Sequence, residues 1–539
     1  MMDRPLLISS LIEQAARFHG NVEIVYREVD DSLCRYTYRD AHRRMKKLAN
    51  ALVRRGIRPG DRVATLAWNT HRHLELYYGI SGIGAVLHTV NPRLFREQIR
   101  FIINHAENRV LFFDLSFLEM IEDLASELTT IETFVALAPR AALPDSALPL
   151  VSYEDFIAPE SDAFDWPEFD ERTASSLCYT SGTTGDPRGA LYSHRSTILH
   201  TLSACAVDGH GVSGGECILP VVPMFHGNAW GIPYSAISSG AKLVLPGRHL
   251  DGATLYDLIE AEKVTLALGV PTVWQGLLLH MEPRGLKLSS LRKLLIGGSA
   301  VPQAMVEAFR DGYGVRIVQA WGMTEMSPMG AVAAPKHHHW QAGQAALDAV
   351  NQSQGRPPSL VDARITDEAC RELPHDGIAR GDLYVRGPWV IGEYYRDPKS
   401  TADNITTDGW LKTGDVCTID PDGFIRVVDR SKDMIKSGGE WISSIDLENI
   451  AASHPAVAEA AVIAVAHPKW DERPLLVVVP RSGAHVARAE LLRHFEGRVA
   501  KWWYPDDVLV VDSIPHTATG KISKAELRKS LRDYRLPTA

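Results

Sequence analysis

The residues best suited to chemistry form the segment YTSGTTGDPRG at positions 179–189, which combines hydroxyl groups, glycines and an arginine. Glycines allow backbone N–H groups to turn toward an anion, hydroxyl groups donate hydrogen bonds to phosphate oxygens, and a cation offsets the phosphate charge. An ordinary surface turn needs only one or two such residues. The segment therefore predicts a phosphate-binding loop, made by Thr180, Ser181, Gly182, Thr183, Thr184, Gly185 and Arg188.

This loop resembles the phosphate loop of the acyl-adenylate-forming (AMP-binding) enzymes, a superfamily that includes acyl-CoA synthetases, peptide-synthetase adenylation domains and firefly luciferase. The resemblance extends from about Leu6 to Leu531, and it is strongest for bacterial medium-chain acyl-CoA synthetases and methylmercaptopropionate-CoA ligases. The family usually has lysine where this chain has Arg188. Arginine keeps the charge and adds a fork of donors, so the two side chains are not equivalent.

The resemblance assigns nucleotide and metal contacts to three further motifs. IGGSAVP (296–302) would lie along the adenine, and QAWGMTEMSP (319–328) would follow it. In the second motif Trp321 would stack on adenine, Thr324 would bind the α-phosphate, and Glu325 would hold Mg²⁺. The complete set implied is Thr180–Gly185, Arg188, Gly298, Ser299, Ala300, Ala320, Trp321, Gly322, Met323, Thr324, Asp415 and Arg430, with Glu325 and Thr184 at the metal.

The same resemblance assigns the ribose and the second half-reaction to the C-terminal third of the chain. Asp415, in WLKTGD, would accept hydrogen bonds from both ribose hydroxyls, and Arg430 would assist it. Within RSKDMIKSGGEW (430–441), Lys432 matches a hinge, Lys436 faces the site in a second orientation, and Gly438 and Gly439 line a pantetheine tunnel. Lys521, in PHTATGKISK, matches the lysine that catalyses adenylation; on its own, it reads as a solvated charge.

The acyl group is the least constrained part of the prediction. His226, in PMFHGNAW, matches a position beside the reacting carboxylate, although a satisfied core histidine is the alternative. Gly227 replaces a bulkier residue expected in close relatives and adds room. The expected catalytic residues are Lys521, His226, Thr324 and Glu325, and the expected acyl pocket is His226, Gly227, Trp230, Val270, Trp274 and Met323. An apolar pocket wall and an ordinary core residue look alike in a sequence.

Short apolar runs alternate with helical patterns before these motifs. Residues 62–68, 109–114 and 133–138 read as strands, and Tyr38–Gly56 reads as one of the helices between them, which indicates βα units and parallel sheet. From about Gln354 short strands separated by turns indicate a small antiparallel element. After Arg430 we expect a helix (445–453), two strands (456–465, 474–480) and a helix (488–500). Residues 333–353, rich in His and Gln, read as a polar surface loop.

The predicted fold class is therefore α/β. A large N-terminal domain would contain two βα-type subdomains and a small antiparallel barrel-like element, and a small mobile α+β domain would follow. The resemblance places an AMP-binding adenylation domain at 1–430 and the mobile C-terminal domain at 431–539.

Composition limits the setting and the partners. The net charge of −9 argues against nucleic acid, and six scattered cysteines without a CxxC pair argue against a zinc site or a disulfide framework. No apolar run is long enough to span a bilayer and the N-terminus lacks the apolar core of a signal peptide, so a cytoplasmic protein is expected. Its oligomeric state stays open, with a homodimer as one alternative.

The resemblance implies an acid:CoA ligase that converts ATP, a carboxylate and CoA into acyl-CoA, AMP and pyrophosphate through an acyl-adenylate. ATP, Mg²⁺ and coenzyme A would be its cofactors, and medium-chain, branched or aryl-substituted monocarboxylic acids of fatty acid metabolism its substrates. One alternative is the same adenylation chemistry with transfer to a carrier protein's phosphopantetheine. A second is a catalytically silent acyl- or nucleotide-binding protein.

Overall fold

The computed structural model describes residues 1–180, 186–438, 440–481, 483–516 and 522–538. The described residues form two compact units. The first contains residues 1–180, 186–362 and 386–411, and the second contains residues 363–385 and 412–538. Over the described ranges, no helix combines the length and the apolar character needed to cross a lipid bilayer.

One sheet of the first unit has seven strands in the order β7-β6-β5-β3-β4-β8-β9. The strands are β3 (Arg62–Leu66), β4 (Val86–Thr89), β5 (Val110–Phe113), β6 (Thr133–Ala136), β7 (Leu150–Ser152), β8 (Ala174–Tyr179) and β9 (Gly189–Ser193). All neighbours are parallel except β8 and β9. The predicted strands at 62–68, 109–114 and 133–138 are therefore confirmed, and the predicted phosphate segment connects β8 to β9.

The second sheet of this unit has eight strands in the order β15-β14-β13-β12-β10-β11-β1-β2. They are β1 (Glu23–Arg27), β2 (Leu33–Thr37), β10 (Cys217–Pro220), β11 (Lys242–Val244), β12 (Leu266–Gly269), β13 (Lys293–Ile296), β14 (Arg316–Gly322) and β15 (Met329–Val332). β1 with β2 and β14 with β15 are antiparallel, whereas the strands between them are parallel. The βα-type organisation is thus confirmed in two separate sheets.

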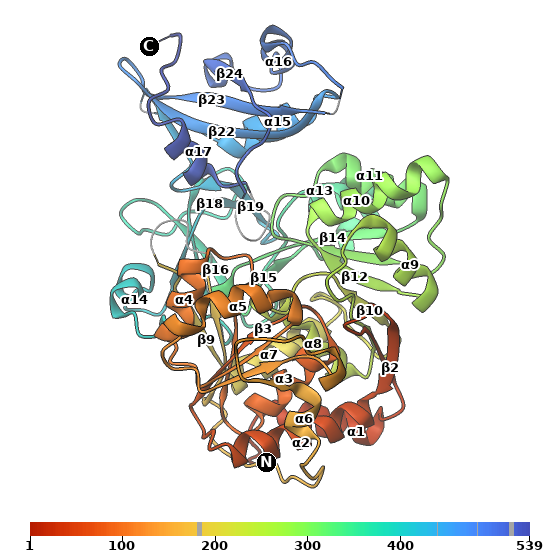
Figure 1. Cartoon of the computed structure of the whole chain (residues 1–539). Coiled ribbons are helices and arrows are strands. Elements are labelled where there is room, and N and C mark those ends of the chain that lie inside the picture. Colours follow the sequence, from red (N-terminus) through yellow and green to blue (C-terminus); the bar gives the residue numbers. More distant parts are fainter. Residues whose placement is uncertain (181–185, 439, 482, 517–521, 539) are drawn as a thin grey trace. The chain divides into compact units, whose positions relative to one another are not determined.

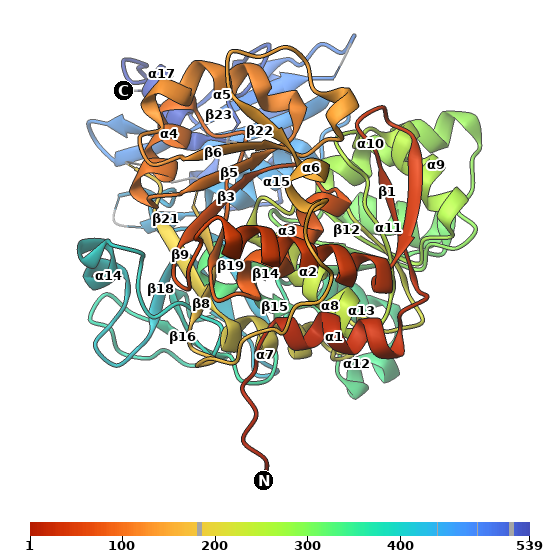
Figure 2. The same cartoon turned by 60° about the horizontal axis from the view of Figure 1, so that its bottom comes forward.

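The helices of the first unit cover these sheets (Figures 1 and 2). They are α1 (Ser9–Phe18), α2 (Tyr38–Arg54), α3 (His71–Ser81), α4 (Arg96–His105), α5 (Leu118–Leu124), α6 (Tyr153–Ile157), α7 (His194–Cys205), α8 (Ile232–Ser239), α9 (Gly252–Glu262), α10 (Pro271–Met281), α11 (Gln303–Tyr313), α12 (His337–Ala342), α13 (Gln344–Asn351) and α14 (Pro398–Asn404). Apolar side chains of α9, α10 and α11 form one buried core with β10, β12, β13 and β14.

Helix α2 shows how the sequence specifies such an element. Thr37 begins it with a capping box, because its hydroxyl accepts from the Asp40 N–H while the Asp40 carboxylate accepts from the Thr37 N–H. Its buried positions recur at helical spacing, as in Ala41, Met45 and Leu48. The apolar stripe packs against α1 and α3, whereas charged residues cover the opposite face. The predicted helix Tyr38–Gly56 is confirmed to within two residues.

The prediction of a polar loop over 333–353 is wrong, because helices α12 and α13 occupy most of this segment. Gly343 separates them with a φ of 87°. Val350 is buried, the Asn351 amide donates to the Ile317 carbonyl at 2.8 Å, and Asp348 pairs with Arg310 at 2.8 Å. Three tertiary contacts thus hold α13 in place, although the His and Gln residues of the segment are polar enough to suggest a loop.

The second unit contains a four-stranded sheet in the order β16-β17-β18-β19 and a five-stranded sheet. The first has β16 (Asp362–Thr366), β17 (Gly381–Arg386), β18 (Leu411–Ile419) and β19 (Ile425–Arg430); the second has β20 (Ile435–Ser437), β21 (Glu440–Ile442), β22 (Val457–His467), β23 (Asp471–Pro480) and β24 (Asp507–Val510). Helices α15 (Ser444–Ala452), α16 (Arg488–His494) and α17 (Lys524–Ser530) accompany them. The elements predicted after Arg430 are present, although α16 ends well before residue 500.

Candidate functional site

The two ends of the predicted phosphate segment are hydrogen-bonded to each other. The Thr180 N–H donates to the Arg188 carbonyl at 2.9 Å, and the Arg188 N–H donates to the Thr180 hydroxyl at 3.3 Å. Both residues therefore lie at the adjoining ends of β8 and β9. Ser181, Gly182, Thr183, Thr184 and Gly185 lie outside the described residues, so their phosphate contacts stay predictions.

Tyr394 connects Arg188 to Glu325. The Arg188 guanidinium lies over the Tyr394 ring, 4.7 Å from its centroid, and the Tyr394 hydroxyl donates to Glu325 Oε1 at 2.7 Å. Burial and the nearby carboxylate raise the pKa of Tyr394, so its hydroxyl remains a donor at neutral pH. Tyr394 could not be predicted from the sequence, because a tyrosine in the segment GEYYRDP carries no local sign of this contact.

The Thr324–Met326 turn holds two predicted site residues in a fixed position. Thr324 accepts from the Tyr192 hydroxyl at 2.5 Å through its carbonyl, and the Glu325 carbonyl accepts from the Ile391 N–H at 2.9 Å. The Glu325 side chain is buried. In the described part of the chain its carboxylate has no hydrogen-bond donor besides Tyr394. A buried carboxylate oxygen with spare acceptor capacity is a ligand that suits Mg²⁺.

Glycines make the close approaches around Trp321 possible. A Cβ on Gly322 would lie 1.7 Å from the Pro328 carbonyl oxygen, and a Cβ on Gly330 would lie 2.5 Å from the Trp321 ring. Both distances are far below van der Waals contact. The hairpin between β14 and β15 therefore folds back tightly, which packs part of the half-buried Trp321 ring against backbone.

A left-handed segment brings the predicted acyl-binding residues to the same motifs. Gly227, Asn228, Ala229 and Trp230 have φ values of 50°, 50°, 48° and 56°. A Cβ on Gly227 would contact the Pro328 ring at 3.5 Å, and one on Gly297 would lie 3.2 Å from the Trp230 ring. Gly227 and Trp230 thus meet the start of β15 and the end of β13. Non-glycine residues in this conformation are uncommon and collect at functional sites.

Asn228 anchors this segment to the strand that leads into the phosphate segment. Its amide donates to the Ser176 hydroxyl at 3.0 Å, and its carbonyl oxygen accepts from the Tyr77 hydroxyl at 3.3 Å. Asn228 is buried, and Ser176 lies within β8. Asn228 was not among the residues predicted from the sequence. Its ability to adopt left-handed φ, beside Gly227, is the one local signal available.

Three further predicted pocket residues differ in their surroundings. Trp274 is fully buried in the core formed with β12, and a Cβ on Gly269 would lie 2.8 Å from its ring. Val270 precedes α10, and His226 precedes the left-handed segment, with both partly exposed. The acyl-binding roles of these three residues stay predictions.

The predicted ribose pair forms in the second unit. Asp415 and Arg430 are direct partners on β18 and β19, and Arg430 Nε lies 2.8 Å from Asp415 Oδ1. The Asp415 side chain is buried, whereas the Arg430 side chain is half exposed. This pairing orients the carboxylate, which is what a ribose-binding role needs.

The predicted hinge and tunnel residues follow Arg430 in the chain. Lys432 and Lys436 are exposed, and Lys436 Nζ lies 5.8 Å from the centroid of the Trp441 ring. Gly438 has a φ of 61°, and a Cβ there would lie 2.9 Å from the Trp470 ring. The conformation and the close approach both favour glycine at this position. Gly439 and Lys521 lie outside the described residues.

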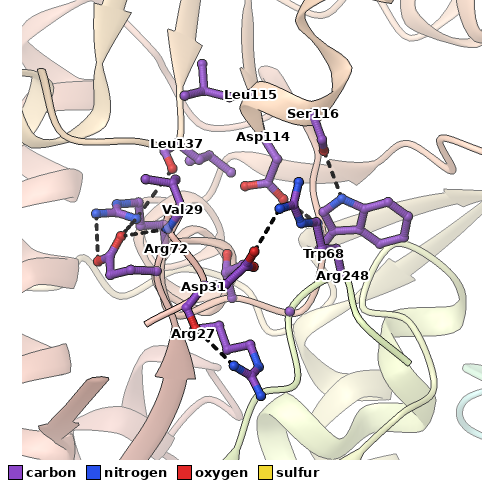
Figure 3. Close-up of a pocket in the computed structure, with 13 residues that line it drawn as sticks. Arg27, Val29, Asp31, Trp68, Arg72, Asp114, Leu115, Ser116, Leu137 and Arg248 are labelled. Atoms are coloured by element: carbon purple, nitrogen blue, oxygen red, sulfur yellow. Dashed lines mark hydrogen bonds and ion pairs between the residues drawn. The ribbon is translucent and has the colours of Figure 1, made fainter. Parts of the chain in front are cut away.

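A separate cavity of about 110 Å³ lies in the first unit at the carboxyl ends of β3, β5 and β6 (Figure 3). Arg72 and Arg248 in its wall pair with Glu28 and Asp31 at 3.0 and 2.9 Å. Burial raises the pKa of Asp114, which also faces the cavity, to about 7. None of the predicted site residues that the structure describes lines this cavity, so it is distinct from the site assembled above.

Comparison with known proteins supports the same family resemblance over nearly the whole chain. Residues 11–395 match the AMP-binding enzyme family, and residues 446–521 match the AMP-binding enzyme C-terminal domain. The chain is 51% identical to a 3-methylmercaptopropionyl-CoA ligase of Ruegeria lacuscaerulensis, with 99% of this chain and 98% of the relative covered. It is 49% identical to a medium-chain-fatty-acid–CoA ligase of Ectopseudomonas oleovorans over the same shares.

A solved structure shows the same fold. The crystal structure of the anthranilate CoA ligase AuaEII in complex with anthranoyl-AMP has a TM-score of 0.87 at 24% identity, with 98% of each chain covered. The two family matches together span most of the residues that form both units. This chain belongs to the AMP-binding enzyme family.

Proposed function

We propose that this protein is an AMP-forming acid:CoA ligase, which activates a carboxylic acid with ATP as an acyl-adenylate and transfers the acyl group to coenzyme A. The observation that carries the proposal is the cluster of Arg188, Tyr394 and Glu325 at the end of β8, where a cation and a buried carboxylate adjoin the phosphate segment. Relatives about half identical over their full length are acyl-CoA ligases.

The first half-reaction has an electrostatic difficulty rather than an acid–base one. A carboxylate is already ionised at neutral pH, but it must attack the α-phosphorus of a polyanion. Arg188 offsets charge on the leaving phosphates, and Lys521 offsets charge between the carboxylate and the α-phosphate. Thr324 and the backbone from Gly298 to Ala300 position the nucleotide, with Trp321 against the adenine. Glu325 and Thr184 would hold Mg²⁺, which supplies further neutralisation of the phosphates when bound.

The second half-reaction requires the CoA thiol beside the adenylate carbonyl. We place a hinge at Lys432, about which the C-terminal domain (431–539) turns relative to the adenylation domain (1–430). The turn would withdraw Lys521 and present Lys436, Gly438 and Gly439 to the pantetheine. The two family matches leave residues 396–445 between them, which supports a domain boundary in this interval.

The acid is expected to be an apolar monocarboxylate of medium length. Residues 225–230 and 270–274 contain no Arg, Lys, Asp or Glu, so a second carboxylate would be buried without a partner, which costs several kcal/mol. Each buried methylene contributes roughly 0.8 kcal/mol, which is about fourfold in affinity per carbon. The relatives that act on medium-chain and methylmercaptopropionic acids support this range, with branched or aryl-substituted acids also accepted.

A panel of acids tests the proposed function. With ATP, Mg²⁺ and straight monocarboxylates of increasing length, we expect pyrophosphate release without CoA and AMP release only when CoA is added. Catalytic efficiency should rise with length to a medium-chain maximum, and dicarboxylates should be rejected. AMP release with a phosphopantetheinyl carrier protein but not with free CoA would favour the carrier alternative. No pyrophosphate with any acid would favour a silent binding protein.

We expect substitution of Gly227 to destabilise the fold before it alters acid selection. Left-handed φ costs an L-residue roughly 1–2 kcal/mol, and a β-branched side chain costs more. Gly227→Ala should therefore lower the melting temperature slightly, because its Cβ meets Pro328 only at ordinary contact distance, and Gly227→Val should lower it further. Thermal unfolding measures this, and Gly409→Ala is the control, since Gly409 is left-handed with open space around it. A lower length optimum in Gly227→Val but not in Gly409→Ala would place Gly227 in the acyl pocket.

We further propose a cytoplasmic location. The six cysteines, all in described parts of the chain, are free thiols, which suits a reducing compartment. A homodimer also stays a proposal, and the molar mass in solution would test it.

A further inference from the structure

A buried carboxylate links the two sides of the proposed hinge. Asp429, at the end of β19, is fully buried, and its Oδ2 accepts hydrogen bonds from both the N–H and the hydroxyl of Ser444 at 2.6 Å. The neighbouring Ser443 hydroxyl donates to the Val428 carbonyl at 2.7 Å. Asp429 precedes Lys432, whereas Ser444 follows it and opens α15. A turn of the chain at Lys432 must therefore separate these groups.

A lysine from α17 completes this buried network. Lys524 Nζ donates to the Ser444 hydroxyl at 2.6 Å and lies 2.7 Å from Glu448 Oε1. The Lys524 and Glu448 side chains are only 11% and 17% exposed. Glu448 Oε1 also accepts from the Val462 N–H on β22, against which both α15 and α17 pack (Figure 1). One ammonium group thus joins α17, α15 and, through Ser444, the end of β19.

A second ion pair holds α17 beside the C-terminal side of the proposed hinge. Arg528, one turn further along α17, lies 2.7 Å from the Asp433 carboxylate, which directly follows Lys432. Burial raises the pKa of Glu448 to about 7 although Lys524 opposes this, so the network lies in a water-poor environment. Hydrogen bonds to charged groups in such an environment are strong, and the loss of one partner leaves the others buried and unsatisfied.

We propose that Lys524 is a positioning residue that fixes the orientation of the C-terminal domain about Lys432 by bridging Ser444, Glu448 and, through Ser444, Asp429. The proposal rests on the proposed two-step function, because its consequence is a bias between the two half-reactions. Lys524 is three positions after Lys521, so the helix that it anchors is also the one that follows the predicted adenylation lysine. Weakening the network moves the population toward the other orientation, which favours one half-reaction at the expense of the other.

The test measures both half-reactions in the full-length enzyme. Pyrophosphate release without CoA reports adenylation, and thioester formation from added acyl-adenylate and CoA reports transfer. Lys524→Met should change the ratio of the two rates about tenfold or more, the loss expected for hydrogen bonds to a charged group. Lys524→Arg should restore part of the wild-type ratio. Ser444→Ala should change the ratio in the same direction as Lys524→Met. Lys529→Met is the matched control, because Lys529 is an exposed lysine on the same helix.

A second measurement is independent of activity. The Ser444 N–H donates a hydrogen bond to Asp429. Its hydrogen exchange should therefore be at least tenfold faster in Lys524→Met than in Lys529→Met. The melting temperature of the first unit should be unchanged. Equal reduction of both half-reactions, or unchanged exchange at Ser444, would overturn the proposal. Faster exchange at Ser444 in a protein that forms no adenylate with any acid would reject the proposed function and retain the positioning network. If Lys524→Met does not fold, Ser444→Ala provides both measurements.

Discussion

Lys521→Ala is expected to slow acyl-adenylate formation by about two to three orders of magnitude and to leave transfer from added acyl-adenylate to CoA nearly unchanged. The substitution removes the charge that is predicted to lie between the attacking carboxylate and the α-phosphate. Preorganised charge of this kind acts mainly on the transition state, and removal of one such group typically costs 10²–10³ in rate. The second half-reaction has no pentavalent phosphorus to stabilise, so it has no need of this lysine.

Two measurements separate this expectation from a general loss of structure. Pyrophosphate release with ATP and acid reports adenylation, and thioester formation from synthetic acyl-adenylate reports transfer. Lys529→Ala is a suitable control, because Lys529 is exposed on the helix that follows Lys521. A similar decrease in both half-reactions would contradict the assignment of Lys521 to the first step and the domain turn that removes it from the second.

Glu325→Gln is expected to lower the adenylation rate by about two to three orders of magnitude and to raise the Mg²⁺ concentration needed for half-maximal activity. Glutamine keeps an oxygen that can accept from the Tyr394 hydroxyl, so the local hydrogen bond survives. The negative charge is lost, and a hard divalent cation binds a neutral amide oxygen much less strongly than a carboxylate. The phosphates then keep charge that the metal would have neutralised.

Tyr394→Phe is the matched control for Glu325→Gln. It retains the carboxylate and the ring that lies under Arg188, and it removes only the hydroxyl. Loss of one hydrogen bond to a buried charge costs about 1.5–3 kcal/mol, which should appear mainly as reduced thermal stability. An unchanged Mg²⁺ dependence in Glu325→Gln, or equal Mg²⁺ dependence in both variants, would show that Glu325 does not bind the metal.

Local pattern was sufficient to predict individual helices and strands. The stripe of α2 depends on residues within a few positions of one another, so its periodicity records which face is buried. The continuous apolar run of β5 records a strand that is buried on both faces. The segment around Thr180 likewise has hydroxyls, glycines and a cation together in the chain. The polar surface of α13 hid the contacts of Val350 and Asn351, which are tertiary, and that prediction therefore failed.

The sequence by itself determined the family to which the order of these motifs belongs, and it predicted phosphate-binding hydroxyls, an acidic metal ligand and a ribose-facing carboxylate. Only the tertiary structure decided that Tyr394 would stand between Arg188 and Glu325, and that Lys524 would meet Ser444 and Glu448. The physical reason is the separation along the chain over which each kind of signal acts. Periodicity and turn chemistry depend on neighbours in the chain, whereas a contact between residues 80 positions apart depends on how sheets and helices pack, and no local pattern encodes that geometry.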